Sequence, residues 1–268
     1  MANGGANGEH RARAAAEAIW AAWQRGQRLE ELPESCRPRT LRDGYAAQAM
    51  LEEVSGCRRV GWKIAATNVT GQQHIGVNGP IGGRLLTGKV VSGETAVPIA
   101  GNAMRVAEAE FAFVLGADLP ARNRPYTPEE ALACVAALHP AIELPDSRFA
   151  DFAAAGGAQL AADNACAGLF VPGERAATEW RHLDLAAHPV SLSINGETAS
   201  AGSGADVLGG PLLALAWLAN SHGLRGCGLA AGDMVTTGVC GKPCAIHPGD
   251  SVCADFGVLG RVTLTLAD

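Results

Sequence analysis

The chain lacks the features that mark nucleic-acid-binding and membrane proteins. Its 268 residues include 21 lysines and arginines against 27 aspartates and glutamates, a formal net charge of −6. The basic residues form no cluster or stripe, and neutralising a phosphate backbone requires clustered cations. No uninterrupted apolar run is long enough to cross a bilayer. We therefore expect neither nucleic acid nor a membrane as a partner.

Cysteine is present without a disulfide or zinc pattern. The eight cysteines are scattered, mostly beside small apolar residues, as is typical of buried free thiols in a reducing cytoplasm. Cys240, Cys244 and His247 have a spacing that could bind zinc, but two prolines interrupt the run and no fourth ligand lies at a convincing distance. The N-terminus also lacks the apolar core and cleavage site of a signal peptide. These observations predict a cytoplasmic protein.

Glycine and apolar residues are plentiful and indicate a large core with many turns. Hydrophobic residues make up 48% of the chain and glycine contributes 34 residues, in keeping with one large domain or one domain with a helical extension. Apolar periodicity predicts helices over 9–26 and 39–54, the second with Thr40 as N-cap. We predict an N-terminal helical region over residues 1–57 and a mainly β domain over residues 58–268.

The mainly β part alternates irregularly between strands and helices, which favours an α+β fold with a rolled mixed sheet over a doubly wound sheet. A strand running into a loop is expected at 58–67 and a glycine-rich loop at 78–83. Helices are expected at 128–138 and at 211–223, the latter closed by a C-terminal glycine. Further strands are expected at 104–115, 139–145, 165–171, 188–194, 233–237, 250–256 and 260–266.

The segment RVAEAEFAFVL, residues 105–115, places Glu108 and Glu110 two positions apart in an apolar run. Alternate residues of a strand share a face, so both carboxylates project from the same side. Burying two like charges side by side is costly unless a cation compensates them. Hard oxygen ligands suit Mg²⁺ or Mn²⁺. The alternative is a solvated edge face with two ordinary surface glutamates.

A third carboxylate strengthens the metal hypothesis. Glu143 interrupts another apolar strand in HPAIELPDSRF, residues 139–149. Three glutamates on two strands can hold a metal from one side and leave positions open for substrate and water. Asp146 and Arg148, in the loop that follows, are expected to pair with each other.

Lys63 lies between two bulky apolar residues in VGWKIAAT. Loss of solvation there would lower the pKa of its ammonium toward the range useful for proton transfer. The alternative is a lysine that reaches solvent from the edge of a strand.

These segments, in this order, resemble the 2-keto-4-pentenoate hydratase and 4-oxalocrotonate decarboxylase family within the fumarylacetoacetate hydrolase superfamily. The similarity runs from about Tyr45 to the C-terminus. The matching segments are GWKIAAT (61–67), the glutamine-containing helix ending in GV (72–77), RVAEAEFAFVL (105–115), AIELPDSRF (141–149), ADNACAGLFVPG (162–173), LALAWLAN (213–220) and LAAGDMVTTG (229–238).

The resemblance implies a mixed β-roll of the fumarylacetoacetate hydrolase C-terminal domain type, an N-terminal helical region and a homo-oligomer. It implies Mg²⁺ or Mn²⁺ as the cofactor. The site residues that it implies are the metal ligands Glu108, Glu110 and Glu143, the catalytic proton carrier Lys63, and the substrate-binding residues Asn164 and Thr237. The family commonly has an aspartate where this chain has Ile81, which is expected to make the pocket more apolar and the hydration step less secure.

The activity implied is that of a lyase in the catabolism of aromatic compounds. It adds water to a 2-hydroxy-2,4-dienoate, or to its 2-oxo tautomer, and gives a 4-hydroxy-2-oxo acid. A 4-oxalocrotonate-type decarboxylase remains open, because the same electron sink accepts the electrons released with CO₂. Also open are an acylpyruvate C–C hydrolase, for which no histidine–carboxylate base can be placed, and a non-catalytic partner subunit.

Overall fold

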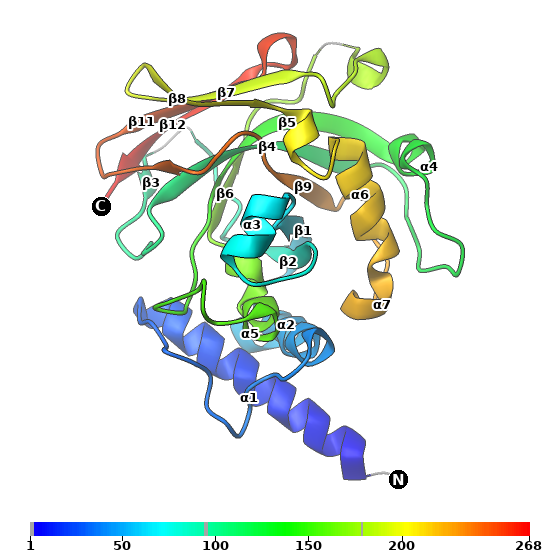
Figure 1. Cartoon of the computed structure of the whole chain (residues 1–268), viewed down its shortest axis with the longest axis vertical. Helices are drawn as coiled ribbons and strands as arrows, with labels where there is room; N and C mark the ends of the chain where they lie inside the picture. The colour runs from blue at the N-terminus through cyan, green and yellow to red at the C-terminus, as the bar shows by residue number, and fades with distance from the viewer. Residues whose placement is uncertain (1–2, 94–95, 178) are drawn as a thin grey trace.

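The computed structural model describes residues 3–93, 96–177 and 179–268. Two β-sheets pack together, and a layer of helices covers one end of the molecule (Figure 1). The larger sheet has the strand order β2-β1-β9-β4-β5-β6, with β10 paired to β4, and the smaller has the order β3-β12-β11-β7-β8. The strands of the larger sheet are β1 (Arg59–Ala65), β2 (Ile81–Leu86), β4 (Val106–Leu115), β5 (Val135–Leu144), β6 (Leu169–Pro172), β9 (Met234–Val239) and β10 (Cys244–Ala245). Those of the smaller are β3 (Val97–Pro98), β7 (Pro189–Ile194), β8 (Glu197–Ser203), β11 (Ser251–Asp255) and β12 (Arg261–Ala267).

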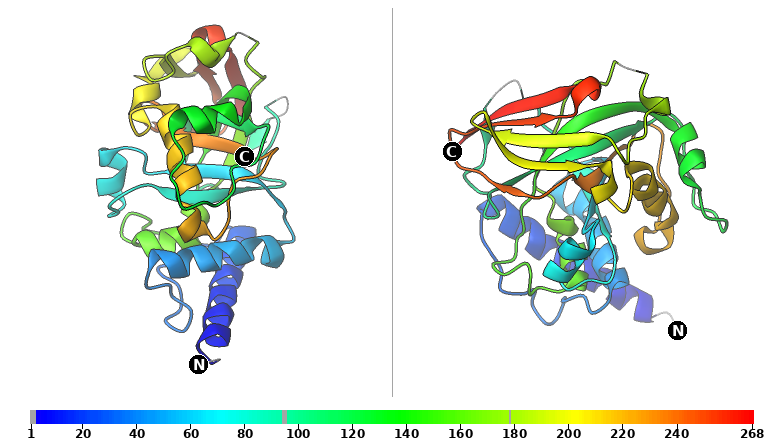
Figure 2. Two further views of the ribbon diagram at one scale, coloured as in Figure 1. Left: turned by 90° about the vertical axis from the view of Figure 1, so that its right-hand side faces the viewer. Right: turned by 45° about the horizontal axis from the view of Figure 1, so that its top comes forward.

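Most neighbouring strands are antiparallel, but β1 pairs with β9 and β12 pairs with β3 in parallel. The sheets are therefore mixed, and Figure 2 shows their curvature. Helices α1, α2 and α5 lie at one end, whereas α4, α6 and α7 run along one side (Figure 1). The helices are α1 (Asn3–Arg25), α2 (Leu41–Ser55), α3 (Val69–His74), α4 (Pro128–Ala133), α5 (Gly157–Ala162), α6 (Pro211–Asn220) and α7 (His222–Arg225). The predicted α+β class, rolled mixed sheet and N-terminal helices are confirmed.

The main core lies between the two sheets, and β4 shows how the sequence builds it. Every second residue of this strand, from Ala107 through Phe111 and Phe113 to Leu115, packs into that core. Residues on the opposite face include Glu108 and Glu110. The strand alternation therefore separates an apolar face from a face that carries carboxylates, as the sequence predicts.

The helical layer has its own core. Ile19 of α1, Leu51 of α2 and Leu160 of α5 belong to one buried cluster. The N-cap prediction for α2 is confirmed, because the Thr40 hydroxyl accepts a hydrogen bond from the Asp43 backbone N–H at 3.2 Å. Helix α5 comes after β1, β2, β4 and β5 in the chain, yet it packs on α2. The helical layer therefore includes residues well beyond residue 57, and the domain boundary at residue 57 stays a prediction.

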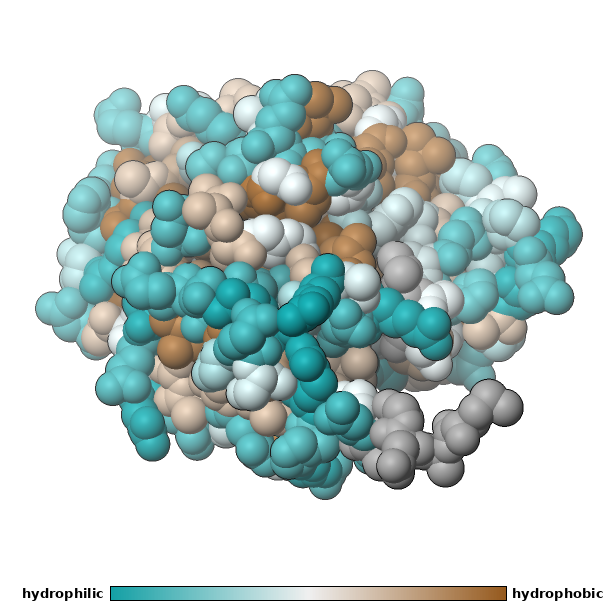
Figure 3. All heavy atoms as spheres, turned by 60° about the horizontal axis from the view of Figure 1, so that its bottom comes forward, coloured by the Kyte–Doolittle hydropathy of each residue, from teal (hydrophilic) through white to brown (hydrophobic). Residues whose placement is uncertain are grey.

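Seen from the end covered by the helices, hydrophilic side chains surround separate apolar patches (Figure 3).

Four local predictions are wrong in whole or in part because tertiary contacts override local preference. The strand expected over 165–171 begins only at Leu169, after a 3-10 turn at Asn164–Cys166. The helix expected over 128–138 ends at Ala133, since the following residues extend β5 along β4 as far as Leu115. The glycine-rich segment expected as a loop continues into β2, which pairs with β1. The helix expected over 211–223 ends at Asn220, and the left-handed glycine is Gly226, after α7.

Candidate active site

The pairing of β4 with β5 brings three glutamates together. Glu108 lies directly opposite Glu143 in the antiparallel register, and Glu110 follows two residues along the same face. Ligand atoms of the three side chains all lie within 4.8 Å of one another. Glu110 and Glu143 are buried and Glu108 is half-buried. A solvated edge face, the alternative interpretation of Glu108 and Glu110, is thereby excluded.

The carboxylates have oxygen atoms left over for a ligand. Glu110 Oε2 accepts hydrogen bonds from the Thr236 hydroxyl and from the Gly238 backbone N–H, the latter at 2.9 Å. Glu110 Oε1 and Glu143 Oε2 are buried without a hydrogen-bond partner. Buried polar atoms are rarely left unsatisfied without a functional reason or an unseen ion. An all-oxygen donor set with free lone pairs fits a hard divalent cation.

The electrostatics of the metal-free site disfavour three negative charges. Burial, followed by repulsion from Glu143, raises the pKa of Glu108 to about 7, although the Lys63 ammonium acts in the opposite direction. Burial also raises the pKa of Glu110 well above its ordinary value, with repulsion from the other two carboxylates adding to the effect. A divalent cation would remove this repulsion, because it compensates the charges on which it binds.

Lys63 completes the site from β1. Its Nζ lies 2.6 Å from Glu143 Oε1 and donates a hydrogen bond to the Ala165 carbonyl oxygen at 2.9 Å. The residue is 2% exposed and lies on an interior strand, so the alternative, a lysine that reaches solvent from an edge, is wrong. Burial acts to lower the pKa of Lys63, but the three carboxylates outweigh it and hold that pKa above its ordinary value. The expected lowering of the pKa is therefore wrong for the metal-free site.

The two predicted substrate-binding residues have their polar groups engaged by the main chain. Asn164 is fully buried; its Oδ1 accepts from the Arg84 backbone N–H at 2.6 Å and its Nδ2 donates to the Arg84 carbonyl at 2.8 Å. The Thr237 hydroxyl donates to the Phe111 carbonyl at 3.2 Å. The neighbouring Thr236 is the residue that contacts the Glu110 carboxylate. Sequence reasoning missed it, because only the pairing of β9 with β4 decides which threonine faces the cluster.

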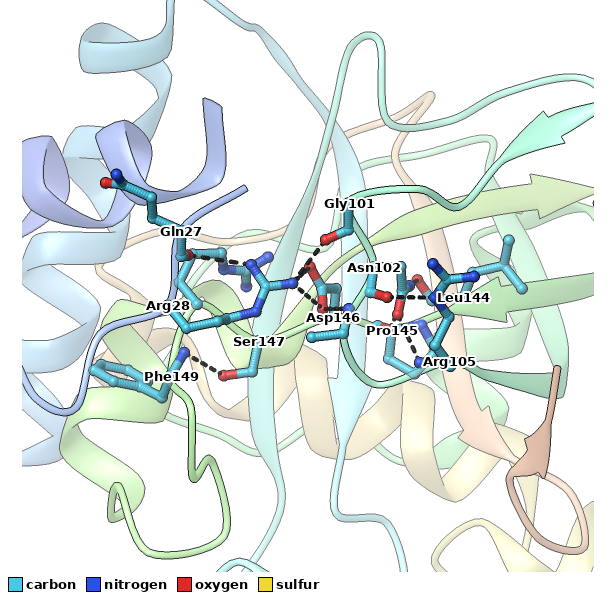
Figure 4. Close-up of polar contacts among 12 residues, drawn as sticks. Gln27, Arg28, Gly101, Asn102, Arg105, Leu144, Pro145, Asp146, Ser147 and Phe149 are labelled. Carbon is cyan, nitrogen blue, oxygen red and sulfur yellow. Dashed lines mark hydrogen bonds and ion pairs between the residues drawn. The ribbon is translucent and has the colours of Figure 1, made fainter. Parts of the chain in front are cut away.

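Asp146 and Arg148 do not pair with each other, contrary to the sequence-based expectation. Asp146 accepts from Arg28 Nη2 at 2.9 Å, and the same guanidinium donates to the Gly101 carbonyl at 2.7 Å (Figure 4). Asn102 Nδ2 donates to the Pro145 carbonyl at 2.9 Å. The segments before β4 and after β5, the two strands that carry the carboxylates, are thus tied together through the connector between α1 and α2. Arg148 pairs instead with Asp163, and both are fully buried.

Two other features noted in the sequence, Ile81 and the possible zinc ligands, lie outside the carboxylate cluster. Ile81 is 1% exposed and packs in the helical-layer core. Cys240 and Cys244 are buried, whereas His247 is largely exposed and faces Asp250. Among the residues that the structure describes, the three glutamates are the one cluster of potential metal ligands that converges. All eight cysteines are free, and no described helix combines the length and apolarity needed to span a bilayer.

The fold and the site together define the class: an α+β enzyme whose mixed β-roll carries an acidic cluster able to hold a divalent ion beside a buried lysine. The chain belongs to the fumarylacetoacetate hydrolase family, since residues 86–267 match the family described as "Fumarylacetoacetate (FAA) hydrolase C-terminal".

Relatives of known name agree with this placement. The chain is 35% identical to a 2-keto-4-pentenoate hydratase of Paraburkholderia xenovorans (strain LB400) over 239 residues, 88% of this chain and 87% of the relative. It is 35% identical over 228 residues to a 2-hydroxyhexa-2,4-dienoate hydratase of Comamonas testosteroni, covering 80% of this chain and 85% of the relative. The solved 4-oxalocrotonate decarboxylase from Pseudomonas putida G7, complexed with magnesium and adipate, matches with a TM-score of 0.87 and 28% identity over 96% of this chain and 97% of that chain.

Stability of the metal-free protein should fall as the pH rises from about 4.5 to about 7. Over this range the folded state keeps a proton on Glu108, whose pKa is raised from 4.5 to about 7, while the unfolded state releases it. Stability decreases with pH wherever the unfolded state binds fewer protons, and the raised pKa of Glu110 acts in the same direction. Metal binding requires deprotonated ligands, so added Mg²⁺ should raise the melting temperature more at about pH 7.5 than at about pH 5.5. Thermal unfolding with chelator or Mg²⁺ checks this, and an equal shift at both pH values would contradict it.

Proposed function

We propose that the protein is a metal-dependent hydro-lyase that adds water to a 2-hydroxy-2,4-dienoate of the 2-oxo-4-pentenoate type and gives a 4-hydroxy-2-oxo acid. The observation that carries the proposal is the convergence of Glu108, Glu110 and Glu143 beside Lys63, in a chain whose named relatives include several hydratases. The three glutamates would hold Mg²⁺ or Mn²⁺. The bound ion would act as a Lewis acid toward the substrate's 2-oxygen.

The chain's own groups supply orientation and a proton. Thr236 and the Gly238 N–H hold one oxygen of Glu110, which fixes the direction of its other oxygen. Two acceptors, Glu143 and the Ala165 carbonyl, occupy two of the three N–H groups of Lys63. The third is available to a bound substrate, so Lys63 can deliver a proton to the substrate's carbon chain and recover it from the attacking water. Asn164 and Thr237 contribute shape to the pocket rather than free polar atoms.

Decarboxylation is the second candidate, because the solved decarboxylase has the closely similar fold given above. The same proton carrier and electron sink serve either reaction, and the fold does not choose between them. An acylpyruvate hydrolase receives no support from the described histidines. His139, His188 and His222 contact backbone carbonyls, and the one histidine in contact with a carboxylate, His247, is exposed.

Purified protein incubated with Mg²⁺ and 2-hydroxypenta-2,4-dienoate tests the proposal. We expect the ultraviolet absorbance of the dienol to fall and a 4-hydroxy-2-oxo acid to form. The matched dicarboxylate should release no CO₂; rapid CO₂ release without hydration would favour the decarboxylase. Calorimetry with Mn²⁺ and oxalate separates both from a non-catalytic partner subunit, because an intact site binds the ion and the chelating acid. Absence of both turnover and binding would refute the proposal.

The natural setting that we propose is a homo-oligomer in the cytoplasm. The family resemblance supports the oligomer, and the eight free cysteines favour a reducing compartment. Light scattering coupled to size-exclusion chromatography measures the oligomer directly.

A further inference from the structure

A strained turn lies directly against the catalytic lysine. Asn164, Ala165 and Cys166 have φ values of 57°, 54° and 56°, a run of three non-glycine residues in the left-handed region. This conformation is unfavourable for residues with a Cβ, and it persists only where the surroundings enforce it. The turn is buried, and the carbonyl of its central residue accepts the hydrogen bond from Lys63 Nζ.

Side-chain contacts from two directions enforce the turn. On one side, the Asn164 amide pairs with both backbone groups of Arg84, as a neighbouring strand would. On the other, Arg148 donates to the Asp163 carbonyl at 2.6 Å and to the Ala167 carbonyl at 2.7 Å, so it brackets the turn at both ends.

Strand β2, which packs against the turn, leaves no room for the turn to adopt another conformation. Gly83 of β2 lies opposite Lys63 of β1 in the register. A Cβ at residue 83 would collide with the Asn164 carbonyl oxygen and would lie 2.9 Å from Lys63 Cγ. The turn, the glycine and the lysine side chain are therefore packed in direct contact, and a shift of the turn moves the acceptor of the lysine's hydrogen bond.

We infer that Asn164 is a positioning residue: its amide locks the turn to β2 so that the Ala165 carbonyl holds Lys63 Nζ against Glu143, with one N–H left for substrate. The inference rests on the proposed function, because it assigns Asn164 a role in the proton transfer proposed for Lys63. It departs from the substrate-binding role that the family resemblance implies, since both polar atoms of the amide are already bonded to the main chain.

The chain contains a matched control at Asn220. Its side chain makes the same pair of bonds to one residue, accepting from the Tyr126 N–H at 2.7 Å and donating to the Tyr126 carbonyl at 3.0 Å. It lies at the end of α6, and its partner is Tyr126 rather than a residue in contact with Lys63 or the carboxylates. Asn164→Gly removes the amide but tolerates a positive φ, and Asn220→Ala removes the amide but keeps a good helix former. Any general loss of stability from removing such a pair of hydrogen bonds is common to both variants.

The experiment measures kcat, KM, Mn²⁺ affinity and the crystal structure of both variants. We expect Asn164→Gly to lower kcat by about 10- to 100-fold, as a displaced catalytic group does, while KM stays within about twofold. Mn²⁺ affinity should not fall, because the carboxylates are untouched and a displaced ammonium opposes the ion less. Its structure should show Lys63 Nζ detached from the carbonyl of residue 165. Asn220→Ala should keep the wild-type kcat. If Asn164→Gly does not fold, Asn164→Asp, which keeps one acceptor oxygen and tolerates the same φ, replaces it.

Two results would overturn the inference: a kcat of the Asn164 variant equal to that of the Asn220 variant, or a crystal structure in which Lys63 keeps its bond to the carbonyl of residue 165. Failure of the proposed function has a different signature, namely a wild-type protein without turnover of any dienol. The crystal structure tests the position of Lys63 even in that case.

Discussion

Glu108→Gln is expected to abolish metal-dependent turnover while leaving the fold intact. The substitution keeps the shape of the side chain but removes one of three negative oxygen ligands, so Mn²⁺ affinity should fall by at least about tenfold. The folded metal-free protein should not suffer, because the raised pKa of Glu108 shows that its negative charge is unfavourable there. The neutral amide should therefore make the metal-free variant as stable as the parent, or more stable, near neutral pH. Calorimetry with Mn²⁺, the dienol assay and urea unfolding check the three effects.

The control for this substitution is Glu197→Gln, which removes an exposed carboxylate from β8 in the other sheet. It should leave metal affinity and turnover unchanged. Full activity of Glu108→Gln would refute the assignment of the carboxylate cluster as the metal centre. A variant that fails to fold would contradict the argument from the raised pKa.

Lys63→Met should raise Mn²⁺ affinity, whereas Glu108→Gln should lower it. Loss of the proton carrier should lower kcat by about 10²- to 10⁴-fold, the usual range for a general acid–base group. The ammonium lies 2.6 Å from Glu143 and competes electrostatically with any cation on the same carboxylates, so its removal should tighten Mn²⁺ binding. Without metal, Lys63→Met should be less stable than the parent, because it leaves Glu143 buried without its ion-pair partner.

Lys89→Met is the control, since Lys89 is half-buried and its ammonium lies over the Trp23 ring rather than contacting the carboxylates. It should bind Mn²⁺ as the parent does and keep its turnover. Two outcomes count against the role given to Lys63. If Lys63→Met binds metal more weakly, the lysine supports the geometry of the carboxylates instead of opposing the ion. If it turns over normally, another group moves the proton.

The opposite effects on metal affinity separate the two roles within one site. Both variants are expected to be nearly inactive, so turnover alone cannot tell a ligand from a proton carrier. A weaker metal site identifies the ligand, and a stronger one identifies the cation that shares its carboxylates. This comparison needs no knowledge of the natural substrate.

Local patterns in the chain were enough for the parts of the site that depend on one element. The period-two alternation of residues 105–115 placed Glu108 and Glu110 on one face, because side-chain direction along a strand follows from the backbone alone. The N-cap Thr40 was predictable because capping is also local: its partner Asp43 lies only three residues away. Glu143 and Lys63 also stood out locally, because each interrupts an apolar strand; the family resemblance assigned them to the same site as Glu108 and Glu110.

Contacts between distant segments decided the rest. The register of β4 on β5 sets Glu108 against Glu143, and a slip of one residue would turn every side chain of the strand to the other sheet face. The direction of the pKa shift at Lys63 depends on three carboxylates from two other strands, so burial alone predicted the wrong sign. The partners of Asp146 and Arg148 are Arg28 and Asp163 rather than each other. The amino-acid order specifies which groups are available and which way each points on its own strand or helix; long-range pairing, which no local pattern encodes, specifies the charges that each group meets.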